Sequence, residues 1–430
     1  MSTAASIQRL YYLLLLGNTL AASFIWGINT IFLLDAGLSN LEAFAANAFF
    51  TAGMVLFEVP TGVVADTVGR RASYLLGTVT LSVTTVLYVL LWVWEAPFVA
   101  WAVVSVLIGL GFTFFSGAVE AWLVDALAAR GFEGELESVF GRGQVVGGAA
   151  MLVGSVAGGY IAQATSLGVP FVLRAVVLLL MFVLAFALMR DLGFTPQPRA
   201  GVVAGVRSIV SASVEYGWRV PAVRWLMVSS AFTAGVAIYA FYALQPYLLE
   251  LYGDPEAYGI AGLVAALTAG AQIVGGLVAP WIRAVFACRT SALLTAAAGS
   301  ALTLALIGLI DSFAVVLVLI AVWGLLYAAD LPIHRAYLNG LIPSQQRATI
   351  LSYDSMLGSS GGVVAQPLLG RSADVWGYGV SYVIGAAISA LALPFLALSR
   401  RERHPADRAR GAPDPEEGAV PVEVPVEQTS

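Results

Sequence analysis

The chain has 430 residues, of which 59% are hydrophobic and only 11% are Asp, Glu, Lys or Arg. A soluble globular protein carries roughly 25% charged residues, so this chain has too few charges to cover a water-facing globule of its size. The composition argues against a soluble enzyme, a nucleic-acid-binding protein and a disordered scaffold. The net charge of -5 indicates no polyanionic partner, and the single cysteine, Cys288, allows no internal disulfide and no cysteine-based metal site.

Long apolar runs make up most of the sequence. A helix that crosses a lipid bilayer needs about 20 mostly apolar residues. The runs are near-continuously apolar and lack the alternation of a membrane β-barrel, so we predict an all-α membrane protein with twelve transmembrane helices. The predicted spans are residues 10–34, 43–65, 72–94, 98–124, 143–165, 169–189, 223–249, 257–280, 290–310, 313–338, 349–370 and 377–398.

One connection is longer than the others and divides the spans into two sets of six. Residues 190–222 contain Pro196 and Pro198, followed by a series of apolar residues at helical spacing. We predict a central cytoplasmic loop there, with a short interfacial helix on the membrane surface. The same division predicts an N-terminal six-helix bundle at residues 1–189 and a C-terminal six-helix bundle at 223–399. A disordered cytoplasmic tail, rich in Pro, Glu and Arg, is predicted at 400–430.

The arginines indicate which side of the membrane each connection occupies. All 21 basic residues are Arg, a usage that points to a GC-rich microbial genome. If the N-terminus is cytoplasmic, 19 of them fall on the cytoplasmic side, and only Arg174 and Arg371 fall on the other. Because positive charges accumulate in cytoplasmic connections, we predict an even number of spans with both termini in the cytoplasm. The expected location is a bacterial or archaeal cell (inner) membrane.

The two halves of the chain repeat each other. Gly159 is followed nine residues later by Gly168, and Gly370 is followed at the same distance by Gly379, an offset of 211 between the pairs. Equivalent matches occur in spans four and ten. Two repeats with a binding site at their interface, near the bilayer midplane, are the architecture of many secondary transporters.

The connection after span two carries a motif. It reads GVVADTVGRR, and Gly62 and Gly69 have the permissive backbone that a tight turn needs. Asp66 can accept hydrogen bonds from exposed N–H groups or from an Arg. Arg70 and Arg71 hold the loop on the inner side and can reach acids on a neighbouring span; alternatively, this pair is only a topology signal.

This motif, in this position, resembles the G-x-x-x-D-x-x-G-R-[KR] signature of the major facilitator superfamily. The resemblance implies twelve helices in two pseudo-symmetric six-helix bundles. It also implies a conformational latch, in which Asp66 and Arg70 form a charge network with an acid at the inner end of span four. Asp125 stands where that acid is expected, and Glu120 is the second candidate.

Two departures from the family's patterns bear on coupling. The fifth span reads GSVAGG from Gly154 to Gly159, which resembles the G-P-x-x-G-G motif of the family's antiporters except that Ser155 replaces the proline. These glycines also suit close helix packing alone. Drug exporters of the family usually carry an Arg in span four, a few residues before a Gly. Here Ser105 stands four residues before Gly109, so any proton coupling must use other groups.

Ionisable groups within the apolar runs are functional candidates, because a charge there costs about 2.5–3.5 kcal/mol on insertion scales. Glu58 lies deep in span two. Asp330 lies at similar depth in span ten, with His334 one turn further on the same face. These two could exchange a proton, because histidine titrates near neutral pH. We take Asp330, Glu58 and His334 as proton-coupling candidates; the alternative is a structural ion pair or hydrogen bond.

Polar and aromatic residues in the spans are candidates for the substrate cavity. Their mixture suits a bulky, partly apolar organic molecule and offers few fixed charges for a phosphate or a metal ion. We predict neither a metal site nor a cofactor. An alternative role for Arg174 is that it snorkels towards the outer interface. The predicted cavity residues are Asn18, Asn29, Phe115, Arg174, Tyr239, Tyr242 and Gln245.

The function that these features favour is proton-coupled efflux of drug-like or amphipathic small organic molecules by alternating access. The alternative within transport is a proton-coupled symporter that imports a metabolite. We do not expect an enzyme, because only His334 and His404 are present and no catalytic or ATP-binding motif occurs. A receptor or a lipid scramblase stays open from the sequence. The expected partners are the substrate, protons and the lipid bilayer, without nucleic acid, for a protein that works as a monomer.

Overall fold

The computed structural model describes residues 3–115, 117–196, 211, 217–342 and 347–408. Nearly all of these residues are helical, and no β-strand occurs among them. The helices of the first half are α1 (Ala4–Trp26), α2 (Asn29–Asp35), α3 (Asn40–Thr67), α4 (Arg70–Val93), α5 (Phe98–Thr113), α6 (Ala118–Ala128), α7 (Leu136–Ala164) and α8 (Gly168–Leu188). Those of the second half are α10 (Pro221–Tyr252), α11 (Tyr258–Val285), α12 (Arg289–Leu309), α13 (Phe313–Leu341), α14 (Arg347–Ala390), α15 (Ala392–Arg401) and the 3-10 helix Pro405–Asp407.

The predicted fold of twelve transmembrane helices is confirmed. In the described ranges, 10 helical stretches are long and apolar enough to cross a bilayer on their own. Helices α1 and α2, bent by 47° to each other, make a further span. The stretch from Ile350 to Arg401 holds two spans, because Gly377 turns the chain back with a φ of 82°. Only glycine adopts this conformation without strain, so span eleven can pass directly into span twelve.

Local sequence signals set several helix ends. Helix α3 begins with a capping box, in which the Ser39 side chain accepts from the backbone N–H of Glu42 and the Glu42 carboxylate accepts from that of Ser39. Helix α10 ends at Gly253, which has a φ of 82°. Spans one and four break near glycine: Gly27 follows α1, and Gly117, with a φ of 67°, precedes α6.

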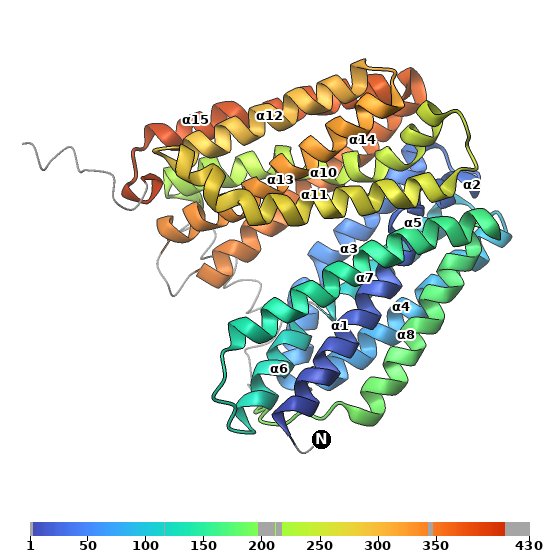
Figure 1. The fold of residues 1–430 in the computed structure, drawn as a ribbon, viewed down its shortest axis with the longest axis vertical. Coiled ribbons are helices and arrows are strands. Elements are labelled where there is room, and N and C mark those ends of the chain that lie inside the picture. The colour runs from blue at the N-terminus through green and yellow to red at the C-terminus, as the bar shows by residue number, and fades with distance from the viewer. Residues whose placement is uncertain (1–2, 116, 197–210, 212–216, 343–346, 409–430) are drawn as a thin grey trace, which may run out of the picture.

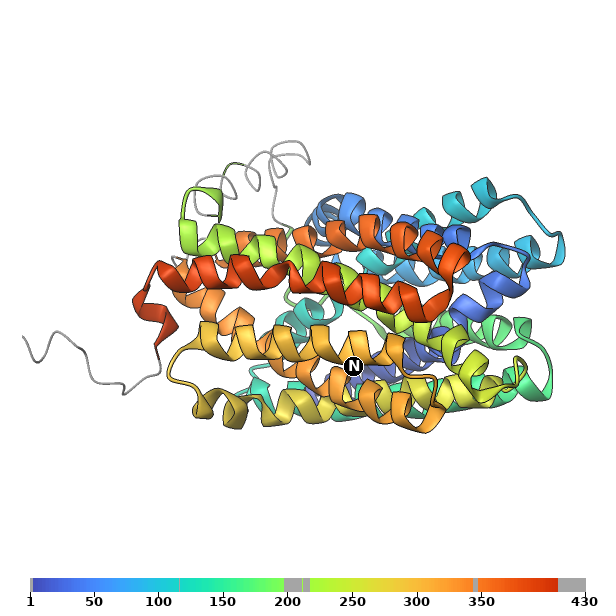
Figure 2. The same ribbon diagram turned by 90° about the horizontal axis from the view of Figure 1, so that it is seen from above.

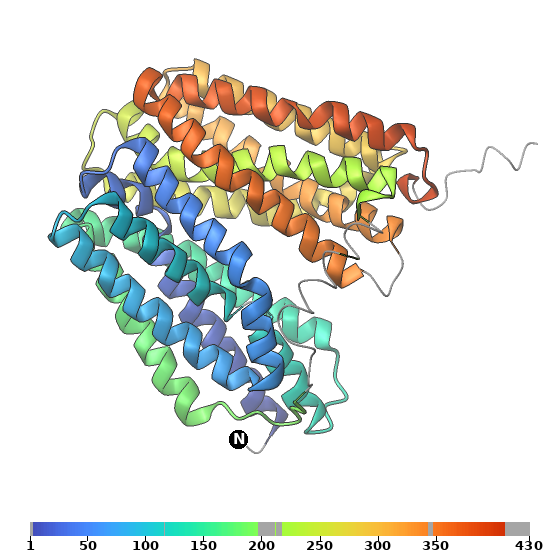
Figure 3. The same cartoon turned by 180° about the vertical axis from the view of Figure 1, so that it is seen from behind.

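The helices form two bundles that meet at one end of the molecule and diverge towards the other (Figure 1). Within the first bundle, α1 packs on α7 and α8, and α3 on α5; within the second, α10 packs on α14, and α11 on α13. Helices α7 and α11 meet near α2 and separate towards the opposite end, and Figure 3 shows the same division from behind. In Figure 2, seen from above, the second bundle lies over the first. We call the two ends the closed end and the open end. The start of α1 and the end of α15 both lie at the open end.

Glycines allow the two bundles to touch backbone to backbone near the closed end. A Cβ atom at Gly159 of α7 would lie 2.5 Å from the carbonyl oxygen of Tyr258 and 3.0 Å from the Cα of Gly262. A Cβ at Gly262 would in turn lie 2.5 Å from the carbonyl oxygen of Ser155. Such separations exclude any larger residue. The GSVAGG stretch, which includes Ser155 and Gly159, is therefore part of the contact between the bundles.

Polar contacts also join the bundles at the closed end. The carboxylate of Asp374 on α14 accepts hydrogen bonds from the first backbone N–H groups of α3, at Asn40 (2.8 Å) and Leu41 (2.9 Å). The Gln245 side chain of α10 accepts from the backbone N–H of Thr30 at 2.8 Å and donates to the carbonyl oxygen of Trp26 at 2.7 Å. We call Asp374 and the α3 N-terminus the closed-end clasp.

The domain boundaries need one correction. The interfacial helix predicted in the loop at 190–222 falls mostly on residues outside the described ranges. The predicted disordered tail at 400–430 begins too early, because α15 continues to Arg401 and the chain then packs against α12 as far as Arg408. The charge and proline content of this segment favours the prediction of disorder, whereas the contact depends on one buried acid, Asp407. Its carboxylate accepts from the backbone N–H and from the hydroxyl of Thr290, both at 2.7 Å.

Replacing Asp407 by Ala should lower the stability of the second bundle. The carboxylate is 4% exposed and satisfies both the first turn of α12 and a buried hydroxyl. Losing such a charged cap costs about 2 kcal/mol. We expect a fall in Tm of several degrees in detergent. Glu402→Ala, which removes the same charge from an exposed neighbour, should leave the Tm unchanged; an equal fall in both variants would refute the capping role.

Candidate functional site

A cavity lies between the two bundles and is lined by residues of both. Its volume is about 420 Å³, and its walls are mostly aromatic and apolar, with Thr51, Gln272 and Ser359 as polar exceptions. A cavity of this size and lining suits a bulky organic molecule with little charge. We call it the central cavity. Its aromatic walls come from Trp26, Phe50, Phe112, Phe241, Tyr242, Trp323 and Tyr327.

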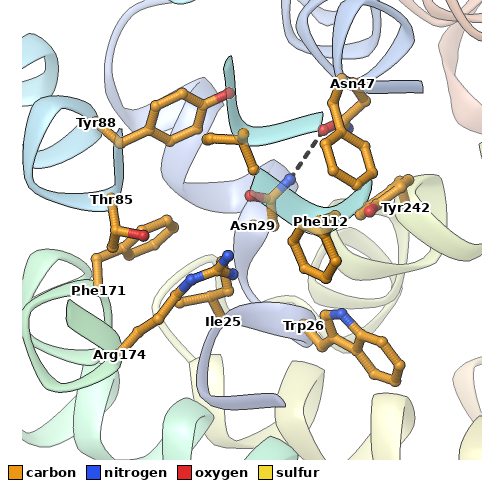
Figure 4. Close-up of a pocket in the computed structure, with 12 residues that line it drawn as sticks. Ile25, Trp26, Asn29, Asn47, Thr85, Tyr88, Phe112, Phe171, Arg174 and Tyr242 are labelled. Atoms are coloured by element: carbon orange, nitrogen blue, oxygen red, sulfur yellow. Dashed lines mark hydrogen bonds between the residues drawn. The ribbon is translucent and has the colours of Figure 1, made fainter. Parts of the chain in front are cut away.

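A smaller and more polar pocket adjoins the central cavity and shares Trp26, Phe50, Phe112 and Tyr242 with it. Its volume is about 60 Å³, and Figure 4 shows the side chains that line it. We call it the head pocket.

The polar side of the head pocket comes from α2, α3, α4 and α8. The Asn29 side chain donates to Asn47 Oδ1 at 3.0 Å, Tyr88 adds a hydroxyl group, and Arg174 enters from α8. Tyr88 is held by a hydrogen bond of 2.5 Å with Ser105, the residue that stands where a span-four Arg was expected. The one guanidinium of this pocket therefore comes from span six instead of span four.

Other predicted cavity residues are divided between the cavity walls and the packed core. Asn18 and Phe115 line a third cavity, of about 280 Å³, together with Arg174 and Glu120. Tyr239 lies instead in the core of the second bundle, where its hydroxyl pairs with Ser381. Gln245, described above, is buried in the contact between the bundles.

The coupling candidates of span ten lie inside the second bundle. Asp330 and His334 line a polar cavity of about 30 Å³, large enough for one or two water molecules. Tyr327 and Trp323 line both this cavity and the central cavity, so they stand between the two. One layer of side chains therefore separates these titratable groups from the central cavity.

His334 has a partner that was not predicted from the sequence. Its Nε2 atom lies 3.0 Å from Asp354 Oδ2 on α14, and the Ser230 hydroxyl donates to Asp354 Oδ1 at 3.0 Å. The Ser230 hydroxyl also lies 3.4 Å from His334 Nε2, so this histidine contacts Asp354 on span eleven and Ser230 on span seven. Asp330, by contrast, lies on the same helix as His334. Asp354 lies within a predicted apolar run, so the rule that selected Asp330 also selects it. Glu58 is half-buried on α3, in the first bundle.

The predicted latch residues come together at the open end of the first bundle. Arg70 Nη1 lies 2.5 Å from Asp66 Oδ1, and Arg70 Nε lies 3.9 Å from Asp125 Oδ2. Arg71 points to a different side, where its guanidinium donates to the carbonyl oxygen of Phe186 at 2.8 Å. All of these groups belong to one bundle. Glu120 is not among them, because it is exposed and lines the third cavity.

The loop after α8 completes this cluster. Asp191 Oδ1 accepts from the backbone N–H of Arg71 at 2.9 Å and so caps the start of α4. Burial raises the pKa of the Asp191 carboxyl, although that hydrogen bond and the charges of Arg71 and Arg70 act in the opposite direction. The sequence did offer a signal: Asp191 follows span six on the same predicted side as the arginine pair.

The comparisons with known proteins decide the family. The family model described as Major Facilitator Superfamily matches residues 11–297 and 257–426, which together span nearly the whole chain. The chain belongs to the major facilitator superfamily. No curated protein matches the sequence. The fold is therefore that of a transporter family.

Solved structures of this superfamily share the fold at low sequence identity. The nucleoside transporter NupG superposes with a TM-score of 0.74 at 12% identity, covering 93% of this chain and 99% of its own. A bacterial homologue of the human lysosomal transporter Spinster, in an inward-facing and unoccupied conformation, gives 0.70 at 15% identity, covering 94% and 98%. A D-xylose-proton symporter gives 0.64 at 17% identity, covering 91% and 95%.

The superfamily motif includes two glycines with different roles. Gly69 has a φ of 128° and precedes α4, and a Cβ atom there would overlap the Asp191 carboxylate. Gly62, predicted to serve the same turn, lies inside α3. A Cβ atom added at Gly62 would meet nothing within 4 Å, so the turn does not require this glycine.

Gly69→Ala should therefore destabilise the protein, and Gly62→Ala should not. A strained backbone costs about 1–3 kcal/mol, and the displaced Asp191 would add to it. Within a helix, Ala is favoured over Gly by about 0.5–1 kcal/mol. Thermal unfolding of both purified variants tests this pair. A Gly69→Ala variant as stable as the native protein would show that the turn tolerates a side chain.

Proposed function

We propose that this protein is a secondary active transporter that exports amphipathic small organic molecules in exchange for protons. The observation that carries the proposal is the aromatic central cavity between two bundles that diverge at one end. Such a cavity binds its substrate at the interface of the repeats, and rocking of the bundles exposes it to either side in turn. Membership of a transporter superfamily supports this mechanism over an enzyme.

The arginine distribution supports an orientation. The connections at the open end carry Arg70, Arg71, Arg283 and Arg289, and the positive-inside rule assigns such connections to the cytoplasm. We propose that the open end faces the cytoplasm of a bacterial or archaeal cell, that the described shape is inward-open, and that the protein works as a monomer.

Import of a metabolite is the second candidate. The observation that favours it is the head pocket, where the fixed charge of Arg174 and the amide groups of Asn29 and Asn47 converge. A charged group with fixed hydrogen-bond partners selects one class of substrate more strictly than an apolar wall does.

Transport in cells separates the two directions. A deletion strain and an overexpressing strain are compared on a panel of amphipathic compounds at two external pH values. Export predicts that overexpression raises resistance and lowers accumulation, and that a protonophore reverses both. Higher accumulation on overexpression would establish import instead. A panel with no gradient-dependent change in either direction would contradict coupled transport of this substrate class.

A further inference from the structure

We propose that the transported molecule is a monoanion, an organic carboxylate, whose charged group binds Arg174 in the head pocket while its apolar body occupies the central cavity. This inference rests on the proposed transport function and names the substrate class of that site.

Arg174 is a buried cation without a counter-ion among the described residues. It is 4% exposed, and its Nε atom makes no hydrogen bond. Its guanidinium lies over the ring of Phe112, whose centroid is 5.5 Å from the guanidinium carbon. Burying a charge away from water is costly unless an opposite charge or hydrogen bonds compensate. Arg174 lies at the wall of a cavity, so a bound anion could compensate its buried charge.

Snorkelling does not account for this arrangement. A snorkelling arginine keeps its charged group in water while only its aliphatic part is buried. Here the whole side chain is buried, and the guanidinium points into the head pocket among Tyr88, Phe112 and Tyr242 (Figure 4). Glu120 shares the third cavity with Arg174, but it is exposed and no ion pair joins the two.

A second buried donor in the same pocket also lacks an acceptor. Asn47 is 4% exposed; its Oδ1 atom accepts from Asn29, whereas its Nδ2 atom makes no hydrogen bond. Unsatisfied buried donors are rare in native proteins, and each calls for an explanation such as a ligand that binds there. Arg174 and Asn47 together offer one positive charge and neutral N–H donors, the complement of a carboxylate. One cation balances a monoanion, whereas a phosphate dianion would leave a negative charge unpaired.

The dimensions agree with a ligand of two parts. The head pocket, of about 60 Å³, holds a group no larger than a carboxylate with its first carbon atoms. The central cavity, of about 420 Å³, adjoins the head pocket at the shared residues Trp26, Phe50, Phe112 and Tyr242. An aromatic or branched apolar body fits there. A carboxylate that enters the head pocket therefore has its hydrocarbon part directed into the aromatic cavity.

Equilibrium binding to the full-length protein in detergent tests this inference. The probes are pairs of an aromatic or branched carboxylate and its carboxamide, such as 2-naphthoate with 2-naphthamide, measured by calorimetry without any gradient. We expect at least one carboxylate to bind about tenfold or more tightly than its amide, the scale of a hydrogen bond to a charged group. Arg174→Gln should abolish that preference, and Arg174→Lys should retain part of it.

A matched control variant and a stability measurement test whether the loss of preference is specific to Arg174. Arg371→Gln removes the same charge from an exposed position and should keep the preference. Without ligand, Arg174→Gln should have an equal or higher Tm than the native protein, because it removes an uncompensated buried charge. An unchanged or higher Tm shows that a lost preference does not result from misfolding. Equal binding of acid and amide in every pair, or a preference that survives Arg174→Gln, would overturn the inference. Either result leaves the transport assay in cells to decide the proposed function independently.

Discussion

Asp330→Asn is expected to abolish the response of transport to a pH gradient while leaving folding and substrate binding largely intact. Asn keeps the size of Asp and removes only the titratable proton. Asp330 lies in a small polar cavity separated from the central cavity by Trp323 and Tyr327, so its charge can respond to the substrate across one layer of side chains. Protonation would remove a charge from within the bilayer, where it costs about 2.5–3.5 kcal/mol on insertion scales.

The measurement is substrate flux in proteoliposomes with and without an imposed pH gradient. The native protein should show faster flux with the gradient, and Asp330→Asn should show the same flux in both conditions. Counterflow exchange, which needs no gradient, should persist and so report that the variant is folded and binds substrate. Gradient-driven flux at the native rate in Asp330→Asn would move coupling to another group or remove it.

Two further variants test whether another acid carries the proton coupling. Glu58→Gln tests the other deep acid of the predicted set, which lies in the first bundle, and should retain the pH response. Asp354→Asn removes the partner of His334 and loosens the contact among α10, α13 and α14 that Ser230 completes. We expect a slower cycle that still responds to the gradient. If Asp354→Asn alone removed the response, the His334–Asp354 pair would be the coupling site.

Features that depend on local chain physics could be predicted from the sequence. The lengths of the apolar runs gave the twelve spans, because a bilayer fixes how many residues a helix needs. The short motif places Asp66 and Arg70 four residues apart on either side of a predicted turn, and they do form an ion pair. Gly69 was selected for a turn, and its φ of 128° shows that the turn is there.

Features that depend on which helix packs beside which could not be predicted in the same way. The position of His334 and Asp330 on one face of one helix predicts that the two pair, but the partner of His334, Asp354, lies on another helix, whose position the sequence does not define. Tyr239 and Gln245 share the polar character of cavity residues, yet one lies in a core and the other between the bundles. Helical periodicity defines a face of a helix but not the neighbour of that face.

Asp66→Asn and Asp374→Ala are expected to shift the conformational equilibrium in opposite directions. The clasp at Asp374 joins the two bundles at the closed end, through two hydrogen bonds to the α3 N-terminus. Hydrogen bonds to a charged group contribute about 1.5–3 kcal/mol, less at an exposed position. Asp374→Ala should therefore disfavour the described shape by about tenfold in population and favour opening of the closed end.

The latch at Asp66 acts at the other end. Its ion pair with Arg70 lies within one bundle in the described shape, so it does not itself join the bundles there. Helices α3 and α14 pack against each other, and closing the open end would bring the start of α14 towards the end of α3. A helix N-terminus carries partial positive charge and attracts a carboxylate. Asp66→Asn removes that attraction only from the state in which the open end is closed, and should favour the described shape.

Spin labels at Glu137 and Val285 report the equilibrium, because both residues are exposed and lie at the ends of α7 and α11 that diverge (Figure 1). The background is Cys288→Ser, so that only the two labelled positions are cysteines. Asp66→Asn and Arg70→Ala should both increase the long-distance population, and Asp374→Ala should increase the short-distance one. An unchanged distribution in both Asp66→Asn and Arg70→Ala would refute the latch, whereas the response of Asp374→Ala shows independently that the labels detect the motion.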